Sequence, residues 1–364
     1  MVGLLRWSAF ALTVAGCNFT TPSLGSNAGT PDAAALHSDG PRLDAPAGLD
    51  APVGTCFGTG LLNECFTTLP TQAVELGATA LIDTSTFACD TTVTGKHLEG
   101  VCVIAGATVS LEHGVAVTGN KALLVVATET MTLDDMLDAS SVIGDPGPGA
   151  PGNCDPGTAP GSAGGGAGGS FGGAGGDGGN STGGLHGATL VPTTLVAGCP
   201  GQGGSGNPTG GGLGGGAIYF IAGQSIAVTG LAAIDASGSG GAGGKANNGG
   251  GSGGGAGGMI VFDAPSVAID GDAWATGGGG GEGADTANGH DGNESTSPTR
   301  VGGGGFNDTL HGGNGGDGTA TTGVTGDDRF NSTSAGGGGG GGGGGVIQVY
   351  GTLTGAGRIA PPPS

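Results

Sequence analysis

The sequence predicts an all-β protein: a right-handed parallel β-helix (solenoid) of about 22-residue coils, with long glycine-rich insertions leaving from one corner. Three observations predict this class. Apolar positions return after 22 residues, and they alternate with polar or small residues as in strands with one buried face. Glycine makes up 94 of the 364 residues and gathers in runs that interrupt the later coils.

The first residues have the pattern of an export signal. Residues 1–16 carry Arg6, then an apolar stretch and small residues, and they are too few to span a membrane. Val14-Ala15-Gly16-Cys17 resembles a bacterial lipobox, so we expect a lipid on Cys17 that attaches the chain to a membrane. The alternative is an ordinary signal peptide cut nearby, with Cys17 left as an unpaired thiol. Asn18, in place of Asp, favours delivery to the outer membrane.

The segment after the signal is rich in Pro, Ala, Asp and Gly and has almost no apolar periodicity. We therefore predict a disordered, lipid-anchored tether over residues 17–54 and a disulfide-containing cap over residues 55–79. Without Cys17, six of the seven cysteines remain, an even number that suits an oxidising compartment. Pairing of sequence neighbours is one of fifteen possible arrangements. It would join Cys56 to Cys65, Cys89 to Cys102, and Cys154 to Cys199.

Regular coils are predicted over residues 80–141. The apolar triplet Ile104, Val109 and Leu111 has counterparts 22 residues later and 22 residues earlier. The later set is Val126, Met131 and Leu133, and the earlier one is Ile82, Phe87 and Cys89; by the same shift, Val115 maps back onto Val93. The same internal spacing recurs at Ile221, Ile226 and Val228 and at Phe262, Val267 and Ile269. Stacked coils would bury these side chains between parallel strands.

Residues 142–364 are predicted to be coils interrupted by glycine-rich loops. The loops leave after Asp138-Ala139-Ser140, after Asp235-Ala236-Ser237 and after Ala275-Thr276-Gly277. Insertions at one corner emerge on one face, so they could form an apron over the coils. Disorder is one alternative, because ordering glycine costs much entropy; packed polyproline-II-like helices are the other, and the bracketing Cys154 and Cys199 favour partial order. Prolines 361–363 would stop further strand addition.

The composition excludes several partners. Asp and Glu outnumber Lys and Arg by 29 to 8, so the chain has few cations to neutralise phosphates or anionic lipid headgroups. Aromatic residues, at 4%, leave little surface for stacking bases or sugars. Nucleic acid is therefore not an expected partner.

Several stretches resemble a known group of proteins. They are Cys102-Val103-Ile104-Ala105, residues 122–127, residues 137–141, residues 212–218 and the proline-rich end. The chain from Cys56 onward is similar to glycine-rich, exported, lipoprotein-like β-solenoid proteins of myxobacteria, which are uncharacterised and are sometimes labelled PE-PGRS-like. The N-terminal helical domain of mycobacterial PE-PGRS proteins is missing here. The resemblance implies architecture and brings no active site.

Catalytic patterns are sparse. Two G-x-S-x-G matches lie in glycine runs, outside the strand-to-helix turn that a nucleophile elbow requires. A polysaccharide hydrolase would need paired carboxyls, for which Asp235 with Asp263 or Asp270 are the candidates. Asp138 is expected to stack at a place equivalent to Asp235. The simpler expectation is that these are solvated carboxylates at strand ends.

No resident cofactor or metal is predicted. A calcium site is the one metal site that the sequence suggests, because Asp177 and Asp317 each end a G-G-x-G-x-D match to the calcium-binding repeat. The apolar residue due two places later is Gly179 in one copy and Thr319 in the other, and the copies are not tandem.

Together these features predict a non-enzymatic, lipid-anchored protein of the cell surface, structural or adhesive, that presents an acidic glycine-rich face to extracellular matrix or polysaccharide. The alternatives are a carbohydrate-active β-helix enzyme and an envelope lipoprotein that faces the periplasm; a secreted form is also open. The oligomeric state does not follow from the sequence.

Overall fold

The computed structural model describes residues 54–87, 89, 93–95, 100–206, 210–306, 312–328 and 335–364, with the backbone alone for 93–95. The predicted signal peptide, Cys17 and nearly all of the predicted tether lie outside these residues. The described chain is nearly all-β, with one short 3-10 helix, η1 (Leu76–Ala78). None of its helices has the length and apolar character needed to cross a membrane.

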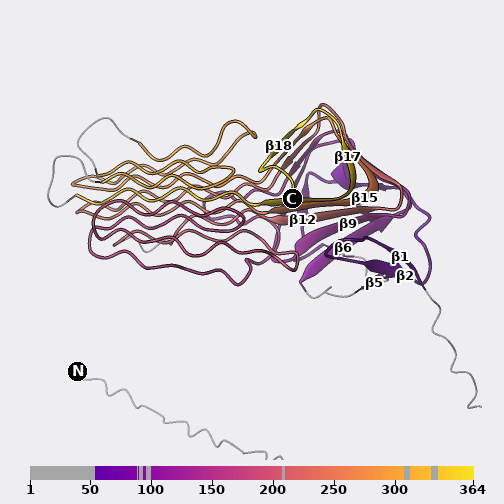
Figure 1. Cartoon of the computed structure of the whole chain (residues 1–364), viewed down its shortest axis with the longest axis horizontal. Coiled ribbons are helices and arrows are strands. Elements are labelled where there is room, and N and C mark those ends of the chain that lie inside the picture. The colour runs from indigo at the N-terminus through magenta and orange to yellow at the C-terminus, as the bar shows by residue number, and fades with distance from the viewer. Residues whose placement is uncertain are drawn as a thin grey trace, which may run out of the picture. The chain divides into compact units, whose positions relative to one another are not determined.

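The strands form one antiparallel and two parallel sheets (Figure 1). The antiparallel sheet contains β1 (Thr55–Phe57), β2 (Glu64–Phe66) and β5 (Val93–Gly95). The nine-stranded sheet contains β3 (Val74–Glu75), β6 (Val101–Gly106), β7 (Val109–Leu111), β9 (Ala122–Ala127), β10 (Thr130–Leu133), β12 (Ala217–Ala222), β13 (Ser225–Val228), β15 (Met259–Ile269) and β17 (Val346–Thr354). The six-stranded sheet contains β4 (Leu81–Asp83), β8 (Val115–Thr118), β11 (Met136–Asp138), β14 (Ala233–Asp235), β16 (Asp272–Trp274) and β18 (Arg358–Ala360). We call the two parallel sheets together the strand stack.

The register of the strand stack follows the predicted repeat at two of its three positions. Met131 pairs with Val109 on one side and with Ile226 on the other. Ile226 in turn pairs with Val267, so this column crosses both insertions without a slip. An all-β fold with parallel sheets is thus confirmed, and it is consistent with a β-solenoid.

The first position of the repeat was placed one residue off. Ile104 pairs with Val125, whereas Val126 pairs with Ile221. Ile104 and Val125 lie in the interior cluster, while Val126 and Ile221 belong to a second cluster on the other face of the sheet. The strands β9 and β12 are buried at every residue, so their sequences carry no period-two signal to show which side chains point inward.

The earliest predicted coil was also wrong. Val109 pairs with Val74 rather than with Phe87, and Phe87 is 38% exposed. Ile82 pairs with Val117, and Val93 lies in β5, antiparallel to β2. Parallel pairing begins earlier than expected, at Val74. It then skips the chain after β4, because that segment leaves the strand stack and joins the antiparallel sheet.

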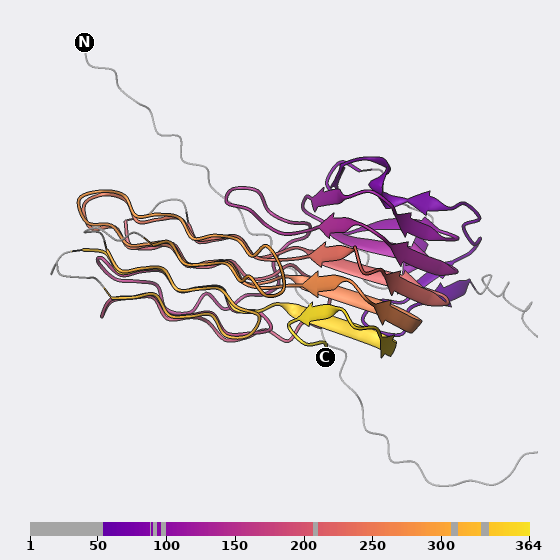
Figure 2. The same cartoon turned by 90° about the horizontal axis from the view of Figure 1, so that it is seen from above.

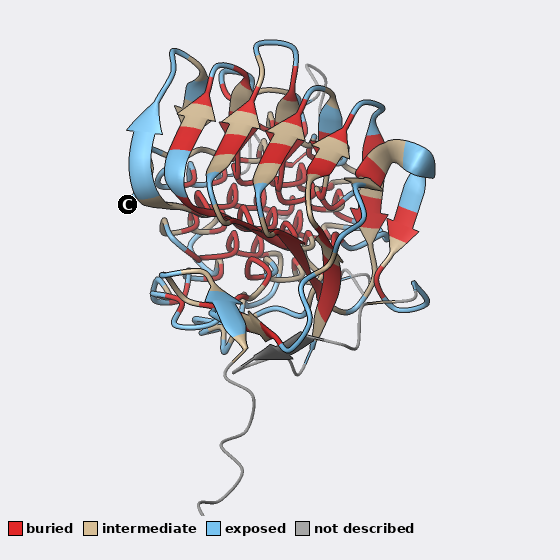
Figure 3. Cartoon of the chain, turned by 90° about the vertical axis from the view of Figure 1, so that its right-hand side faces the viewer, coloured by how far each residue is buried: buried red, intermediate tan, exposed pale blue. Residues whose placement is uncertain are grey.

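Apolar side chains fill two layers. The strands between these layers are mostly buried (Figure 3). The interior of the strand stack is lined by columns of Val, Ile, Leu and Phe, in which Phe220 stacks on Phe262 with ring centroids 5.5 Å apart. The outer layer packs Leu62 and Phe66 of the N-terminal segment, together with Phe171 of the first insertion, against the outside of β6, β9, β12 and β15. The nine-stranded sheet is therefore covered on both faces in this region.

The glycine-rich insertions are ordered. Residues 142–216, 237–258 and 277–345, where described, run side by side away from β12, β15 and β17 (Figures 1 and 2). Their backbone hydrogen bonds recur every third residue; Gly166, Gly169 and their neighbours illustrate this, since Gly166 N–H donates to Gly251 and Gly169 N–H to Gly254. Three residues per turn is the period of the polyproline-II helix. We call these segments the glycine array. The array extends beside the strand stack and does not cover it as the expected apron.

One run lies at the centre of the array. All ten N–H groups of residues 336–345 donate to segments at 163–169, 275–284 and 321–327. Their carbonyls accept from three other segments, at 173–179, 251–257 and 313–319. A three-fold helix with neighbours on every side has no direction in which a side chain can point, which explains why this run is glycine throughout.

Close approach requires glycine at these positions. A Cβ added to Gly340 would lie 2.0 Å from the carbonyl oxygen of Gly176, and one added to Gly341 would lie 2.0 Å from that of Asp317. At the edge of the array the restriction is relaxed: a Cβ on Gly303 would meet nothing nearer than 3.8 Å.

We expect Gly340→Ala to lower the free energy of unfolding by at least about 2 kcal/mol, because the neighbouring backbones must separate to admit the methyl group. Gly303→Ala, with room for its methyl, is the matched control and is expected to change stability by less than about 0.5 kcal/mol. Chemical denaturation of the two variants measures both values. Equal stability would contradict the close packing of the central run.

Candidate functional site

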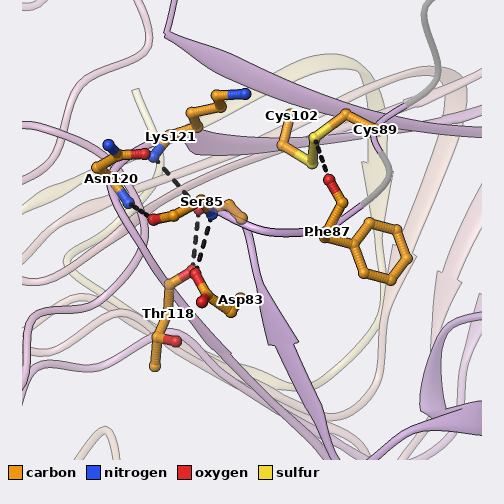
Figure 4. Close-up of a disulfide and its surroundings, with 9 residues drawn as sticks. Asp83, Ser85, Phe87, Cys89, Cys102, Thr118, Asn120 and Lys121 are labelled. Carbon is orange, nitrogen blue, oxygen red and sulfur yellow. Dashed lines mark hydrogen bonds between the residues drawn. A yellow bond between two sulfur atoms is a disulfide. The ribbon is translucent and has the colours of Figure 1, made fainter.

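Three disulfides join the six cysteines of the described residues, and they are the three pairs expected from the sequence: Cys56 with Cys65, Cys89 with Cys102, and Cys154 with Cys199. The second attaches the segment after β4 to β6 (Figure 4). In the same close-up, Asp83 Oδ1 accepts the N–H of Ser85 at 2.9 Å, and Ser85 Oγ accepts the N–H of Asn120 at 2.9 Å. These contacts anchor the segment that departs from the strand stack.

The candidate carboxylate Asp263 lies in β15 and is 2% exposed. Its oxygens accept hydrogen bonds from Thr59 N–H at 2.7 Å, Thr59 Oγ1 at 2.9 Å, Gly60 N–H at 2.8 Å and Tyr219 OH at 2.9 Å. Burial and the adjacent carboxylate raise the pKa of Tyr219. Asp263 therefore holds the N-terminal segment against the outer face of the sheet.

A cavity of about 350 Å³ opens beside this carboxylate. Its lining includes Phe57, Thr59, Pro265 and Tyr350. Because four donors already occupy the oxygens of Asp263, the carboxylate presents little free acceptor capacity to a molecule in the cavity.

The candidate Asp235 stacks on Asp138 as expected, since the two are paired residues of β14 and β11. The next residue in the column is Trp274. Each aspartate makes the same local turn: Asp138 Oδ1 accepts from Ser140 N–H and Oγ at 2.9 and 2.7 Å, and Asp235 Oδ1 accepts from Ser237 N–H and Oγ at 2.8 and 2.5 Å. Such Asx turns redirect the chain from a strand into an insertion.

The expectation of a solvated carboxylate is wrong for Asp235, which is 4% exposed. Desolvation by burial raises its pKa from the ordinary 3.8 to about 7, although the bonds from Ser237 act in the opposite direction; the nearby charge of Asp138 adds to the rise. Trp274, on the neighbouring strand, is 3% exposed, so the covered environment continues along the column.

The third candidate, Asp270, follows β15 and accepts the N–H of Ala356 at 3.2 Å. Asp235 lies in the six-stranded sheet and Asp263 in the nine-stranded sheet, so the fold does not place them on neighbouring strands. The contacts found for all three carboxylates are to donors of the chain itself.

The two calcium candidates also bind the backbone. Asp177 Oδ1 accepts from His186 N–H at 2.9 Å and lies 2.7 Å from His186 Nδ1, while Asp317 Oδ1 accepts from Gly304 N–H at 2.8 Å. Neither belongs to a group of three or more His, Cys, Asp or Glu side chains able to hold a metal within the described ranges.

Sequence reasoning missed the shared role of the acidic side chains. Asp155 accepts from Gly157 and Ala188 N–H, and these bonds lower its pKa. Asp291 and Asp328 accept from Gly243 and Asn180 N–H at 2.7 and 2.6 Å. Carboxylates thus accept hydrogen bonds from amide groups of the glycine array. A non-glycine residue recurs at every third position, as in Ala174, Asp177 and Asn180, and this recurrence is the signal that could have revealed the role of the acids among them.

Two further features are Glu64 and a second cavity. Glu64 is fully buried in β2, and burial raises its pKa to about 7. Neither of its carboxyl oxygens has a hydrogen-bond partner within the part of the chain that the structure describes. The cavity, of about 610 Å³, lies where the array meets the last strand and is lined by uncharged residues that include Val191, Thr321, Gln348 and Pro362.

We expect Asp235→Asn to remove a pH dependence of stability. The folded-state pKa of Asp235 lies above its unfolded value, so its contribution is fully present below about pH 4 and is lost as the pH rises towards 7. Between pH 5 and pH 8 the loss is on the order of 2 kcal/mol. Urea denaturation at both pH values measures it. Asp138→Asn, which alters the half-buried counterpart, is the control and should keep most of the dependence.

We expect Asp263→Ala to detach the N-terminal segment, because the amides of Thr59 and Gly60 and the hydroxyl of Tyr219 lose their acceptor. Limited proteolysis should cut residues 57–63 faster, and stability should fall by about 2 kcal/mol or more. Asp270→Ala, which removes a longer and exposed contact, is the control. Unchanged cleavage in Asp263→Ala would contradict the anchoring role.

No family model, curated protein or solved structure matches this chain. The resemblance to myxobacterial glycine-rich proteins therefore stays a prediction, and the function is argued from the residues described above.

Proposed function

We propose that this chain is a non-enzymatic, lipid-anchored structural or adhesive protein of the cell surface, built on a right-handed parallel β-helix. The observation that carries the proposal is the glycine array: backbone hydrogen bonds join many glycine-rich segments into one block, whose central run leaves no room for side chains. Such a block offers a broad, rigid surface. Its outer side chains would be the groups that meet a partner.

The charge of that surface supports a matrix or polysaccharide partner. Exposed carboxylates on the insertions include Asp145, Asp155, Asp291, Asp317, Asp327 and Asp328. Neutral or cation-bridged polysaccharide suits an acidic face better than an anionic polymer does, because like charges repel. Disulfides support export to an oxidising compartment.

The carbohydrate-active alternative would need a pair of carboxyls free to exchange protons with a substrate. Asp263 is held by four donors, and Asp235 is buried and bonded to Ser237. These contacts support the non-enzymatic proposal. Release of reducing ends from a polysaccharide, abolished by Asp235→Asn, would overturn it.

Protease treatment of intact source cells tests the location. We expect the protein to be lost while a periplasmic control protein survives, because a lipid on Cys17 would hold a chain that faces outward. Blotting for both proteins measures the outcome. Cys17→Ser is the companion variant and should release the protein from the membrane fraction.

Survival of both proteins, with digestion only after lysis, would instead support the periplasm-facing alternative. A membrane fraction that retains Cys17→Ser in full would contradict the lipid anchor.

A further inference from the structure

The two ends of the strand stack differ. At the C-terminal end, β17 pairs with β15 and with no other strand of the described chain. Among the described residues, contacts cover only the start of its outer edge, where Ser364 N–H and Oγ donate to Ile347 C=O. Beyond that point, residues from Gly351 to Thr354 are exposed (Figure 3).

The apolar interior is open at this end. Leu353 continues the interior column of Val267, yet Val267 is fully buried while Leu353 is 40% exposed. Val349 and Ile359, which continue the columns of Phe262 and Ala273, are only partly buried. By contrast Ile347, on the covered part of β17, is 1% exposed.

The opposite end is more fully covered. Its end strands are β3, β4 and β6. Leu76 of η1, Ile82 and Ile104 face the interior there and are 3%, 2% and 8% exposed, while Val74 of β3 is half-buried. The open end of one molecule therefore cannot extend its columns of interior apolar side chains into the opposite end of a second molecule.

The edge strand at the open end also lacks charges that would repel a second copy. The strand β17 contains no charged residue, although the chain carries a net charge of −21. Arg358, in β18, forms an ion pair with Asp272. Natural edge strands are usually protected by charges or prolines, and here the prolines lie only in the tail beside the start of β17. The uncharged cavity of about 610 Å³, with Val191 82% exposed, adjoins the same strand.

We infer that this end is an interface for a second copy of the chain, related by a two-fold axis that places β17 antiparallel to its counterpart. Such pairing covers both open interiors at once and gives the free edge of each β17 a partner, as closed two-fold dimers do. A head-to-tail filament would instead place this open interior against an end whose interior is already mostly buried. A charged partner would find no complementary charge on β17.

Sedimentation velocity of the folded chain over a concentration series tests this interface. We expect dimers, and we expect Leu353→Lys to give monomers, because it places a charge on the apolar surface that the dimer buries. Leu353 is already 40% exposed in one chain, so the fold should tolerate this change, which a thermal melt checks. Thr352→Lys, whose side chain alternates to the other face of the same strand, is the matched control and should remain dimeric.

Hydrogen exchange gives a second readout. Amides of residues 349–354 should be protected in the wild type and should lose protection in Leu353→Lys, whereas amides of β12 should not change. A wild-type chain that stays monomeric at every concentration, or that forms open-ended polymers, would overturn the inference. So would a dimer that Leu353→Lys leaves intact.

Discussion

The structure depends on backbone hydrogen bonds made at distances that exclude a Cβ. Ordering glycine costs more conformational entropy than ordering any other residue, and each backbone bond returns only about 1 kcal/mol net. An isolated glycine helix would therefore not persist. In the central run every N–H has an acceptor, and nearly every carbonyl has a donor, from six surrounding segments. Cooperation among neighbours, and not any single helix, is what stabilises the array.

The strand stack supplies the fixed ends that this cooperation needs. Each glycine segment enters a strand directly, and the ladder continues without a break: Met259 N–H donates to Gly216, and Val346 N–H donates to Gly258. Parallel strands therefore deliver successive glycine runs at a constant spacing. The disulfide between Cys154 and Cys199 ties the first insertion to itself and reduces the freedom of its unfolded form.

The sequence predicts this fold where one face alone is buried. Val109 and Leu111 alternate with Ser110, so their column could be followed across both insertions. Strand β9 is apolar throughout, so no alternation in its sequence indicates its register. No periodic pattern in the sequence indicates that the chain leaves the strand stack after β4. The candidate carboxylates could be listed but their partners could not, because Asp263 meets Thr59 across 204 residues. A run of ten glycines likewise contains no pattern that predicts which six segments form hydrogen bonds with it.

The acidic composition has a physical explanation in the same constraint. Amide N–H groups at the edges of the glycine array have no neighbouring helix whose carbonyls could accept their hydrogen bonds. A carboxylate can take that place, because it accepts hydrogen bonds without donating any. Asp155, Asp291 and Asp317 each accept an amide in this way. Lys and Arg could satisfy carbonyls only. The excess of acids is thus partly structural, so a partner that recognises the array would contact carboxylates already oriented by the backbone they support.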